Sequence, residues 1–391
     1  MSRLRRCVAA AAGLLSLAAA NSLAATPAPL AVISFGRADQ DALNFAFYGA
    51  FGRDTGIPVE AKSYDGQTTE LEQMVRAGQP PWSVMQVESG TLHRGCAQGL
   101  FEKLDYSRLG DTSGFVPGAV SECGLGIFAW SLALVYSDAL ATAPRSWADF
   151  WDVRRFPGKR GLRRSAKYTL EIALLADGVA PEAVYRVLAT EQGQARAFAK
   201  LEQIKNDIIW WEAAAQPAVL MAAGNIAMSS AYTLWFDPRQ QPHARVAWEA
   251  SLYDVDSWAI PRGTARLADA YRFIAYASAP ERQQALSRRI AYGPANRRAL
   301  AGLPAELAAA LPSSDGSLAH AVQVDADFWL AHGPELERRF DAWAPPICRQ
   351  QTDDDDDDYQ DRADCQDVQG QRRGAVAASA PAAAMAAAPV R

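Results

Sequence analysis

The N-terminal part of the chain alternates short apolar runs with amphipathic segments. Residues 31–35 and 57–61 are apolar runs that predict two buried strands. Between them, apolar residues recur at helical spacing and form one stripe, which consists of Leu43, Ala46, Phe47, Ala50 and Phe51. A helix over 68–77 and a strand over 84–87 are expected next. This order predicts a mostly parallel sheet with covering helices, the α/β class.

The same alternation continues to about residue 345. Helices are expected over 168–176, 195–205, 267–278 and 281–290, and strands over 208–211 and 226–229. The segment 246–260 predicts a mixture of helix and strand. In open α/β sheets ligands bind beyond the carboxyl ends of the strands, so Glu88, directly after the strand at 84–87, is a candidate binding residue.

Both ends of the chain differ in composition from the middle. Residues 1–25 combine a basic start, an apolar run and small residues before a cleavage site, and predict a secretory signal peptide. Residues 348–391 contain six consecutive aspartates and an alanine-rich end, and predict a disordered acidic tail. Apart from these, no stretch is long and apolar enough to suggest a membrane span.

Removal of the signal peptide makes the protein more acidic. The 391-residue chain has a formal net charge of −5, and the loss of Arg3, Arg5 and Arg6 would bring it to −8. Nucleic-acid binding favours a basic face, so a nucleic-acid partner is not expected. The length of the chain suggests two structural units rather than one.

Four cysteines would remain after export: Cys96, Cys123, Cys348 and Cys365. An even number in an exported protein predicts disulfides, and four cysteines allow three pairings. Proximity favours Cys96 with Cys123 and Cys348 with Cys365. The sequence has no Cys-x-x-Cys and only scattered histidines, so neither a metal site nor a cofactor is expected.

Two acids, Asp254 and Asp256, stand two positions apart just before the apolar run 258–260. In a strand these positions share one face. Two unpaired carboxylates in a cleft are unfavourable, so a cation is expected between them. The alternative is that Asp256 braces the backbone while Asp254 is solvated.

Several motifs resemble the periplasmic substrate-binding proteins of ABC importers, in the branch that binds spermidine and putrescine. The most specific are DSWAIP and AYGPANRRA, and the segment FPGKRGL supports them. The resemblance covers about residues 30–345. It implies a monomeric periplasmic protein that binds a small amine-bearing molecule and delivers it to separate membrane subunits of an importer.

The resemblance also implies two α/β lobes with a ligand cleft between them. One lobe is expected to comprise 26–131 and 258–301, and the other 132–257 and 302–347. The strands that connect them are expected near 129–134 and 256–260. Hinge closure of such lobes around a ligand is a known structural mode.

The family's ligand contacts carry over to some positions of this sequence. An acid in the polyamine-binding relatives corresponds to Asp256, and aromatic residues correspond to Trp130 and Tyr292. The family's aromatic two positions before the acid is replaced here by Asp254. The further candidates are Glu88, Glu171, Tyr232, and a wall formed by Trp210, Trp211 and Glu212. For each aromatic residue the alternative is an ordinary place in the core.

The segment RSAKYTLE departs from the polyamine binders, which usually have more acids there. It contains one acid, Glu171, and two basic residues, Arg164 and Lys167. A third basic residue, Arg163, directly precedes it. An acidic pole beside a basic cluster suits a zwitterion whose carboxylate contacts Arg164 or Lys167. The segment therefore leaves two ligand classes open, a polyamine and an amino-acid-like or aminobutyrate-like molecule. The alternative for the basic cluster is a solvated helix start.

Two other classes of protein are alternatives to a binding protein. A secreted hydrolase would use Asp254 and Asp256 as paired carboxylates, but the sequence offers no separate general acid and no Gly-x-Ser-x-Gly motif. A ferric-ion binder would need clustered tyrosines, and no adjacent pair occurs. The sequence therefore favours a binding protein without enzymatic activity.

Overall fold

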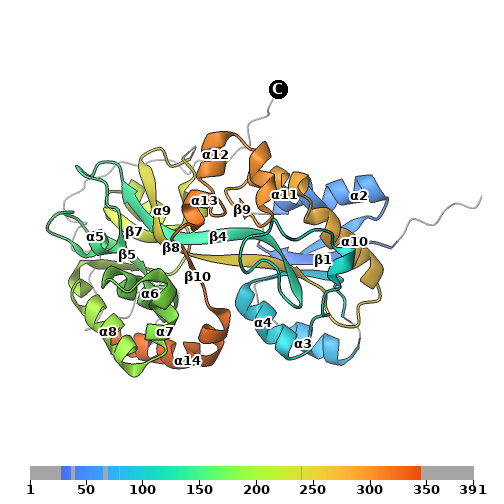
Figure 1. The fold of residues 1–391 in the computed structure, drawn as a ribbon, viewed down its shortest axis with the longest axis horizontal. Coiled ribbons are helices and arrows are strands. Elements are labelled where there is room, and N and C mark those ends of the chain that lie inside the picture. Colours follow the sequence, from blue (N-terminus) through green and yellow to red (C-terminus); the bar gives the residue numbers. More distant parts are fainter. Residues whose placement is uncertain (1–27, 37–39, 65–68, 79, 239, 345–391) are drawn as a thin grey trace, which may run out of the picture.

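Two long strands, β4 (Gly124–Ser137) and β8 (Ala244–Ala259), lie side by side through the middle of the molecule and connect its two lobes (Figure 1). The computed structural model describes residues 28–36, 40–64, 69–78, 80–238 and 240–344. The expected signal peptide, the acidic tail and the second cysteine pair lie outside these residues.

The described strands form one mixed sheet. The strand order is β2-β1-β3-β8-β4-β7-β5-β6, with β10 beside β8 and β9 beside β4. The strands β2, β1 and β3 are parallel at one end of the sheet, and β7, β5 and β6 are parallel at the other. In the centre, β8 is antiparallel to β3 and β4, and β4 is antiparallel to β7. The remaining strands are β1 (Leu30–Phe35), β2 (Val59–Tyr64), β3 (Val84–Val87), β5 (Arg160–Arg163), β6 (Ile208–Trp211), β7 (Met228–Tyr232), β9 (Gly293–Pro294) and β10 (Val322–Gln323).

The first lobe contains the N-terminal helices and two later ones. The predicted apolar stripe is confirmed, because its five residues are all buried. Phe47 and Phe51 pack on the rings of Trp258 and Phe273, which come from the late part of the chain. The helical segments of this lobe are α1 (Gln40–Leu43), the π-helical η1 (Asn44–Tyr48), α2 (Gly49–Thr55), α3 (Thr69–Arg76), α4 (Ser89–Ala97), α10 (Leu267–Ala277) and α11 (Pro280–Ser287).

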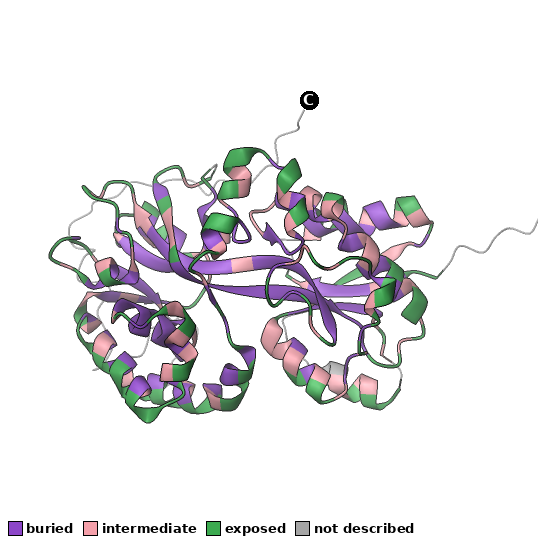
Figure 2. Cartoon of the chain, viewed as in Figure 1, coloured by how far each residue is buried: buried purple, intermediate pink, exposed green. Residues whose placement is uncertain are grey.

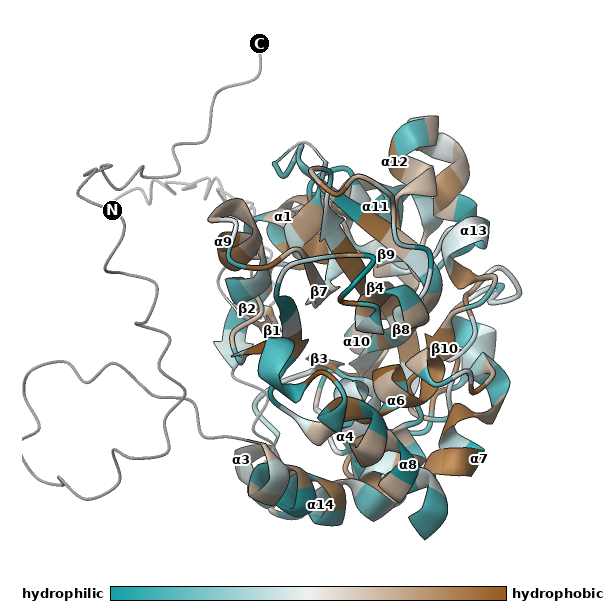
Figure 3. Cartoon of the chain, turned by 90° about the vertical axis from the view of Figure 1, so that its left-hand side faces the viewer, coloured by the Kyte–Doolittle hydropathy of each residue, from teal (hydrophilic) through white to brown (hydrophobic). Residues whose placement is uncertain are grey.

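The second lobe has its own core. Its helices are α5 (Trp147–Trp151), α6 (Ala166–Ala176), α7 (Val184–Leu188), α8 (Glu191–Glu202), α9 (Gln216–Ala222) and α14 (Ala326–Trp343), while α12 (Ala305–Ala309) and α13 (Asp315–Leu318) lie near the crossing strands. Many helices show hydrophilic and hydrophobic residues side by side, as expected for helices that bury one face (Figure 3). None of the described helices has the length and apolar character of a membrane span.

One sequence expectation about the crossing region was wrong. Residues 246–259 all belong to the single strand β8, and the segment contains no helix. From Ala250 onward every residue of this strand is buried, so its two faces do not alternate in polarity (Figure 2). A strand covered on both faces gives no period-2 signal, which is why the sequence pattern was ambiguous.

The predicted Cys96–Cys123 disulfide is present. It joins the last turn of α4 to the loop before β4, with the two Cα atoms 5.8 Å apart. Glu88, the residue directly before α4, lines the cavity described below, so the disulfide fixes a helix next to the site. The exact lobe boundaries stay a prediction.

Candidate ligand-binding site

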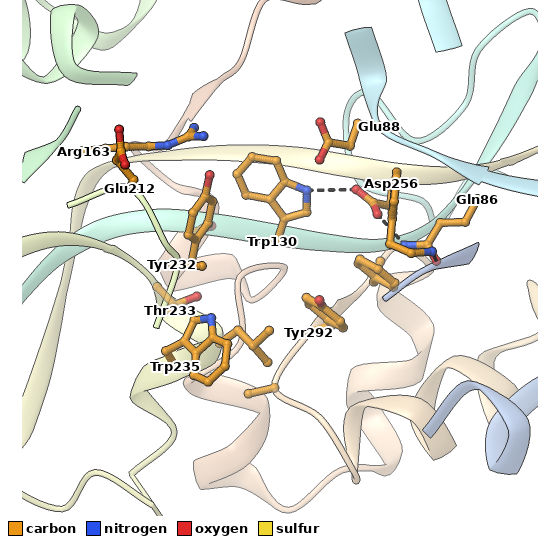
Figure 4. A pocket seen from close by; sticks show the side chains of 16 residues that line it. Gln86, Glu88, Trp130, Arg163, Glu212, Tyr232, Thr233, Trp235, Asp256 and Tyr292 are labelled. Atoms are coloured by element: carbon orange, nitrogen blue, oxygen red, sulfur yellow. Dashed lines mark hydrogen bonds between the residues drawn. The ribbon is translucent and has the colours of Figure 1, made fainter. Parts of the chain in front are cut away.

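A cavity of about 380 Å³ lies between the lobes, where the carboxyl ends of parallel strands from both halves of the sheet meet. This is the position at which open α/β sheets bind ligands. β3 of the first lobe leads to Glu88, and β5 of the second ends at Arg163. The lining residues are Phe35, Gln86, Glu88, Phe128, Trp130, Ser131, Arg163, Glu212, Ala214, Tyr232, Thr233, Leu234, Trp235, Asp256, Ala291 and Tyr292 (Figure 4).

Asp256 is the buried acid of this cavity, with 4% of its surface exposed. Its Oδ1 accepts a 3.0 Å hydrogen bond from Nε1 of Trp130, and its Oδ2 accepts one of 2.6 Å from Nε2 of Gln86. Burial raises the pKa of the Asp256 carboxyl well above its usual range, and the negative charge of Glu88 raises it further. A ligand cation would therefore restore the charged form of this acid.

A bulge in β4 aligns the aromatic residues with Asp256. Gly126 pairs with Ser257 and Phe128 pairs with Asp256, so Ile127 is an extra residue on the β4 side. β-Bulges re-aim side chains beside binding sites. After the bulge, Phe128 and Trp130 both lie on the cavity side of the strand.

Asp254 shares the strand face of Asp256 but its carboxylate has a different task. Its Oδ2 accepts a 2.6 Å hydrogen bond from the Ser89 hydroxyl, and its Oδ1 accepts one of 2.7 Å from the Val255 N–H. On this edge of β8, β10 ends its pairing at Tyr253 and β3 begins at Ser257. Asp254 thus satisfies a backbone donor in a gap of the sheet, and burial raises its pKa to about 6. It lines a second cavity, of about 490 Å³.

The aromatic walls are held by contacts between rings. Tyr292 stacks on Phe128 with centroids 3.9 Å apart and an interplanar angle of 3°. Trp130 meets Tyr232 edge-on at 5.4 Å. Five of the eight sequence-predicted ligand residues therefore meet in the first cavity: Asp256, Glu88, Trp130, Tyr232 and Tyr292.

The other three candidates do not line this cavity. Asp254 lies in the sheet gap described above. Trp211 is fully buried behind the site, with its ring 6.1 Å from that of Tyr232. Glu171 is fully buried in the second lobe, where its Oε1 accepts hydrogen bonds from Nε1 of Trp329 at 2.7 Å and from the Tyr185 hydroxyl at 3.0 Å. Burial raises the pKa of Glu171 to about 7.

The basic residue of the cavity is Arg163, rather than Arg164 or Lys167. Among the described residues, no carboxylate forms a salt bridge with Arg163. Arg164 forms a salt bridge of 2.8 Å with Asp341, and neither residue lines the cavity. Figure 4 shows Arg163 on the side opposite Asp256, with Trp130 and Tyr232 between them. The strand at Arg160–Arg163 was not expected, and recognising its carboxyl end would have identified Arg163.

The start of α6 is strained next to the site. Tyr168 has φ of 76°, in the left-handed region that bulky residues rarely adopt. The turn before it is held by Glu337 of α14, whose carboxylate accepts hydrogen bonds from the N–H groups of Ala166 and Lys167. The buried Tyr168 ring then supports Trp130 from behind, with centroids 6.1 Å apart.

Sequence reasoning missed several lining residues altogether. Nine of the lining residues were not candidates: Phe35, Gln86, Phe128, Ser131, Ala214, Thr233, Leu234, Trp235 and Ala291. Phe35 is the last residue of β1, and Gln86 is the last but one of β3. The strand ends predicted from the sequence could therefore have identified both residues. Trp235 follows β7 in a short turn, and no pattern in the sequence marked it. A grouping with metal-ligand geometry occurs in the described residues at Cys96, Glu122 and Cys123, but both thiols are used in the disulfide.

Comparison with known proteins gives a consistent assignment. Residues 46–312 match the family model described as bacterial extracellular solute-binding protein. A gamma-aminobutyric acid-binding protein of Pseudomonas aeruginosa is 50% identical over 334 residues, which cover 85% of this chain and 95% of the relative. The chain belongs to the bacterial extracellular solute-binding protein family. This family membership confirms the predicted class of solute-binding protein and implies a location outside the cytoplasm.

Solved structures agree with the two-lobed fold of a solute-binding protein. The Atu4243 GABA receptor is 30% identical, with a TM-score of 0.73, and the match covers 83% of this chain and all of that structure. An ABC transporter substrate-binding protein from Bradyrhizobium japonicum is 31% identical, with a TM-score of 0.72, over 81% of this chain and 99% of that structure. Both structures are named for binding, one as a receptor and the other as a substrate-binding protein.

Proposed function

We propose that this solute-binding protein captures a short ω-amino acid of the size of γ-aminobutyrate in the periplasm and delivers it, as a monomer, to the membrane subunits of an ABC importer. An ω-amino acid carries an ammonium group and a carboxylate at opposite ends of a methylene chain. The observation that carries the proposal is a cavity with Asp256 at one end, Arg163 at the other, and the Trp130 ring between them. The relatives named for γ-aminobutyrate binding support it.

The ammonium end would lie at Asp256. A carboxylate about 4 Å from an ammonium group contributes roughly 4 kcal/mol at an effective dielectric constant near 20, before desolvation costs. The aromatic face of Trp130 would add about 0.5 to 2 kcal/mol by a cation–π contact. Because the Trp130 indole also holds Asp256, the ring and the acid are fixed relative to each other.

The carboxylate end would lie at Arg163. A guanidinium group offers planar, paired donors that match a carboxylate. The Arg163 guanidinium is 5.4 Å from the ring centroid of Tyr168 and has no described acid in salt-bridge range. A ligand that leaves this cation unpaired would bind less well than one that supplies an anion.

A diamine such as putrescine is the second candidate, because two acids besides Asp256, Glu88 and Glu212, line the cavity. A diamine has no anion for Arg163, however, and would place its second ammonium near that guanidinium. Repulsion between two cations in a partly buried site makes this arrangement unfavourable. The cavity therefore favours the zwitterion over the diamine.

Calorimetric titration of the exported protein tests the proposal. We expect γ-aminobutyrate to bind at least about 100-fold more tightly than putrescine or pentanoate, each of which lacks one of the two charges, since a desolvated charge pair contributes about 3 kcal/mol or more. The proposal fails if putrescine binds as tightly as γ-aminobutyrate, or if pentanoate does.

A further inference from the structure

A large apolar side chain at the cavity remains open to solvent. Trp235 is 41% exposed, more than any other tryptophan of the described residues. It nevertheless lines the cavity. Its indole N–H finds no hydrogen-bond acceptor among the described residues, and its ring contacts no other aromatic ring there. Single exposed apolar residues are common on proteins, but one that faces a ligand cavity without a partner is placed to contact a ligand.

The backbone that carries Trp235 is firmly anchored. The residue belongs to the 3₁₀ turn η5 (Thr233–Phe236), which follows β7 directly. Phe236 is 3% exposed and packs in a small apolar cluster with Ala218 and Met221 of α9. Thr233, at the other end of the turn, is also buried. The anchored turn η5 thus carries the Trp235 ring, so the part of the cavity wall that this ring forms has a defined position.

The opposite wall belongs to the other lobe. Ala291 and Tyr292 line the same cavity, and Tyr292 is held by its stack on Phe128. Figure 4 shows Trp235 and Tyr292 on the side of the cavity away from Glu88. A movement that brings the lobes together would bring these two walls toward each other.

We propose that Trp235 sets the length of ligand that the site accepts, because its ring closes the cavity against Tyr292 and limits the space for the methylene chain. This inference rests on the proposed function and deepens it. Asp256 and Arg163 select the two charged ends. Trp235 selects the number of methylene groups between them.

The test is a length series with wild type and variants. The series is β-alanine, γ-aminobutyrate, 5-aminovalerate and 6-aminohexanoate, with putrescine and cadaverine as a second series, measured by calorimetry. One buried methylene changes affinity by about fourfold. We expect wild type to prefer one length in whichever series binds. In Trp235→Ala the preference for that length over the longest member should fall at least about tenfold, because the limiting wall is gone and each added methylene regains its contacts.

Two variants make the result specific. Trp235→Phe keeps a ring in the turn and should retain most of the length preference. Phe45→Ala removes an exposed aromatic side chain of the first lobe that does not line the cavity, and should leave the preference unchanged. Circular dichroism melting confirms that the variants fold.

The outcomes separate the two proposals. If wild type binds γ-aminobutyrate but Trp235→Ala shows the same length preference, the inference about Trp235 is overturned while the proposed function stands. If only the diamine series binds and Trp235→Ala alters its length preference, the proposed ligand is wrong and Trp235 keeps its role. If no member binds to wild type, both are overturned.

Discussion

Nε1 of Trp130 donates a 3.0 Å hydrogen bond to Oδ1 of Asp256, so a single strand pair supplies the cavity with both an aromatic face and a fixed acid. The second oxygen of Asp256 is held by Gln86 from β3. Three strands thereby determine the direction of one carboxylate. This arrangement preorganises the site for a cation, and the following expectations depend on it.

Asp256→Asn should abolish measurable binding of γ-aminobutyrate, with at least about a 100-fold loss of affinity, because the ammonium loses its charged partner. The same change should stabilise the ligand-free protein at neutral pH. The raised pKa of Asp256 means that ionisation of this buried acid opposes folding as the pH increases. Calorimetric titration and urea unfolding measure the two effects.

Asp254→Asn provides the comparison, because this acid lies beside Asp256 but contacts Ser89 and the backbone of Val255. Its effect on affinity should be clearly smaller. Equal loss of binding in both variants would mean that the two acids act together on the ligand.

Arg163→Gln should weaken binding of γ-aminobutyrate by about 30-fold or more, since a charged hydrogen-bonded pair typically contributes about 2 kcal/mol. It should not weaken binding of putrescine, which has no carboxylate. Arg164→Gln is the matched control, because the neighbouring side chain pairs with Asp341 outside the cavity. If Arg164→Gln has the larger effect, the carboxylate is bound where the sequence suggested.

Glu171→Gln should change the pH dependence of stability and leave affinity within about twofold. The folded-state pKa of about 7 exceeds the usual 4.5, so folded protein binds a proton over this range and wild-type stability falls as the pH rises through it. The glutamine variant lacks this fall. Relative to wild type, it should gain about 3 kcal/mol between pH 4.5 and pH 8.

Urea unfolding across this pH range makes the measurement, and Glu182→Gln, an exposed acid of the same lobe, is the control. A constant difference between Glu171→Gln and wild type would contradict the raised pKa. A tenfold loss of ligand affinity would restore Glu171 to the binding site.

The double variant Cys96→Ser with Cys123→Ala should lower the free energy of unfolding by up to about 3.5 kcal/mol, because the disulfide closes a loop with a sequence separation of 27. Affinity should also fall, since α4 follows Glu88 directly. Urea unfolding and calorimetry check both. Unchanged stability would show that packing around Cys123 holds α4 without the covalent bond.

Sequence patterns predicted the regular elements better than the contacts between them. The strand over Val84–Val87 and the helical stripe around Phe47 follow from local periodicity, which depends on neighbouring residues alone. The prediction of a mixture of helix and strand at β8 was wrong because residues distant in sequence cover both faces of this strand. Burial from distant segments cannot be read from a local pattern.

The candidate site shows the same limit. Alternation correctly places Asp254 on the strand face of Asp256, but the gap between β10 and β3 redirects its carboxylate to Val255. That gap is a property of strand register, which the sequence does not display. Glu171 was an acid in the right segment, yet its side chain points into the lobe core because Trp329 and Tyr185 bond it there.

The central position of β8 also affects how the chain can reach its native state. Gln86 and Asp256, which share a hydrogen bond, are 170 positions apart, and β8 is antiparallel to both β3 and β4. The strands β3 and β4 therefore lack their common neighbour β8 until the chain has been synthesised as far as residue 259. Proteins dominated by such distant pairings fold slowly. Because the family works outside the cytoplasm, slow folding would help to keep the chain unfolded while it crosses a membrane.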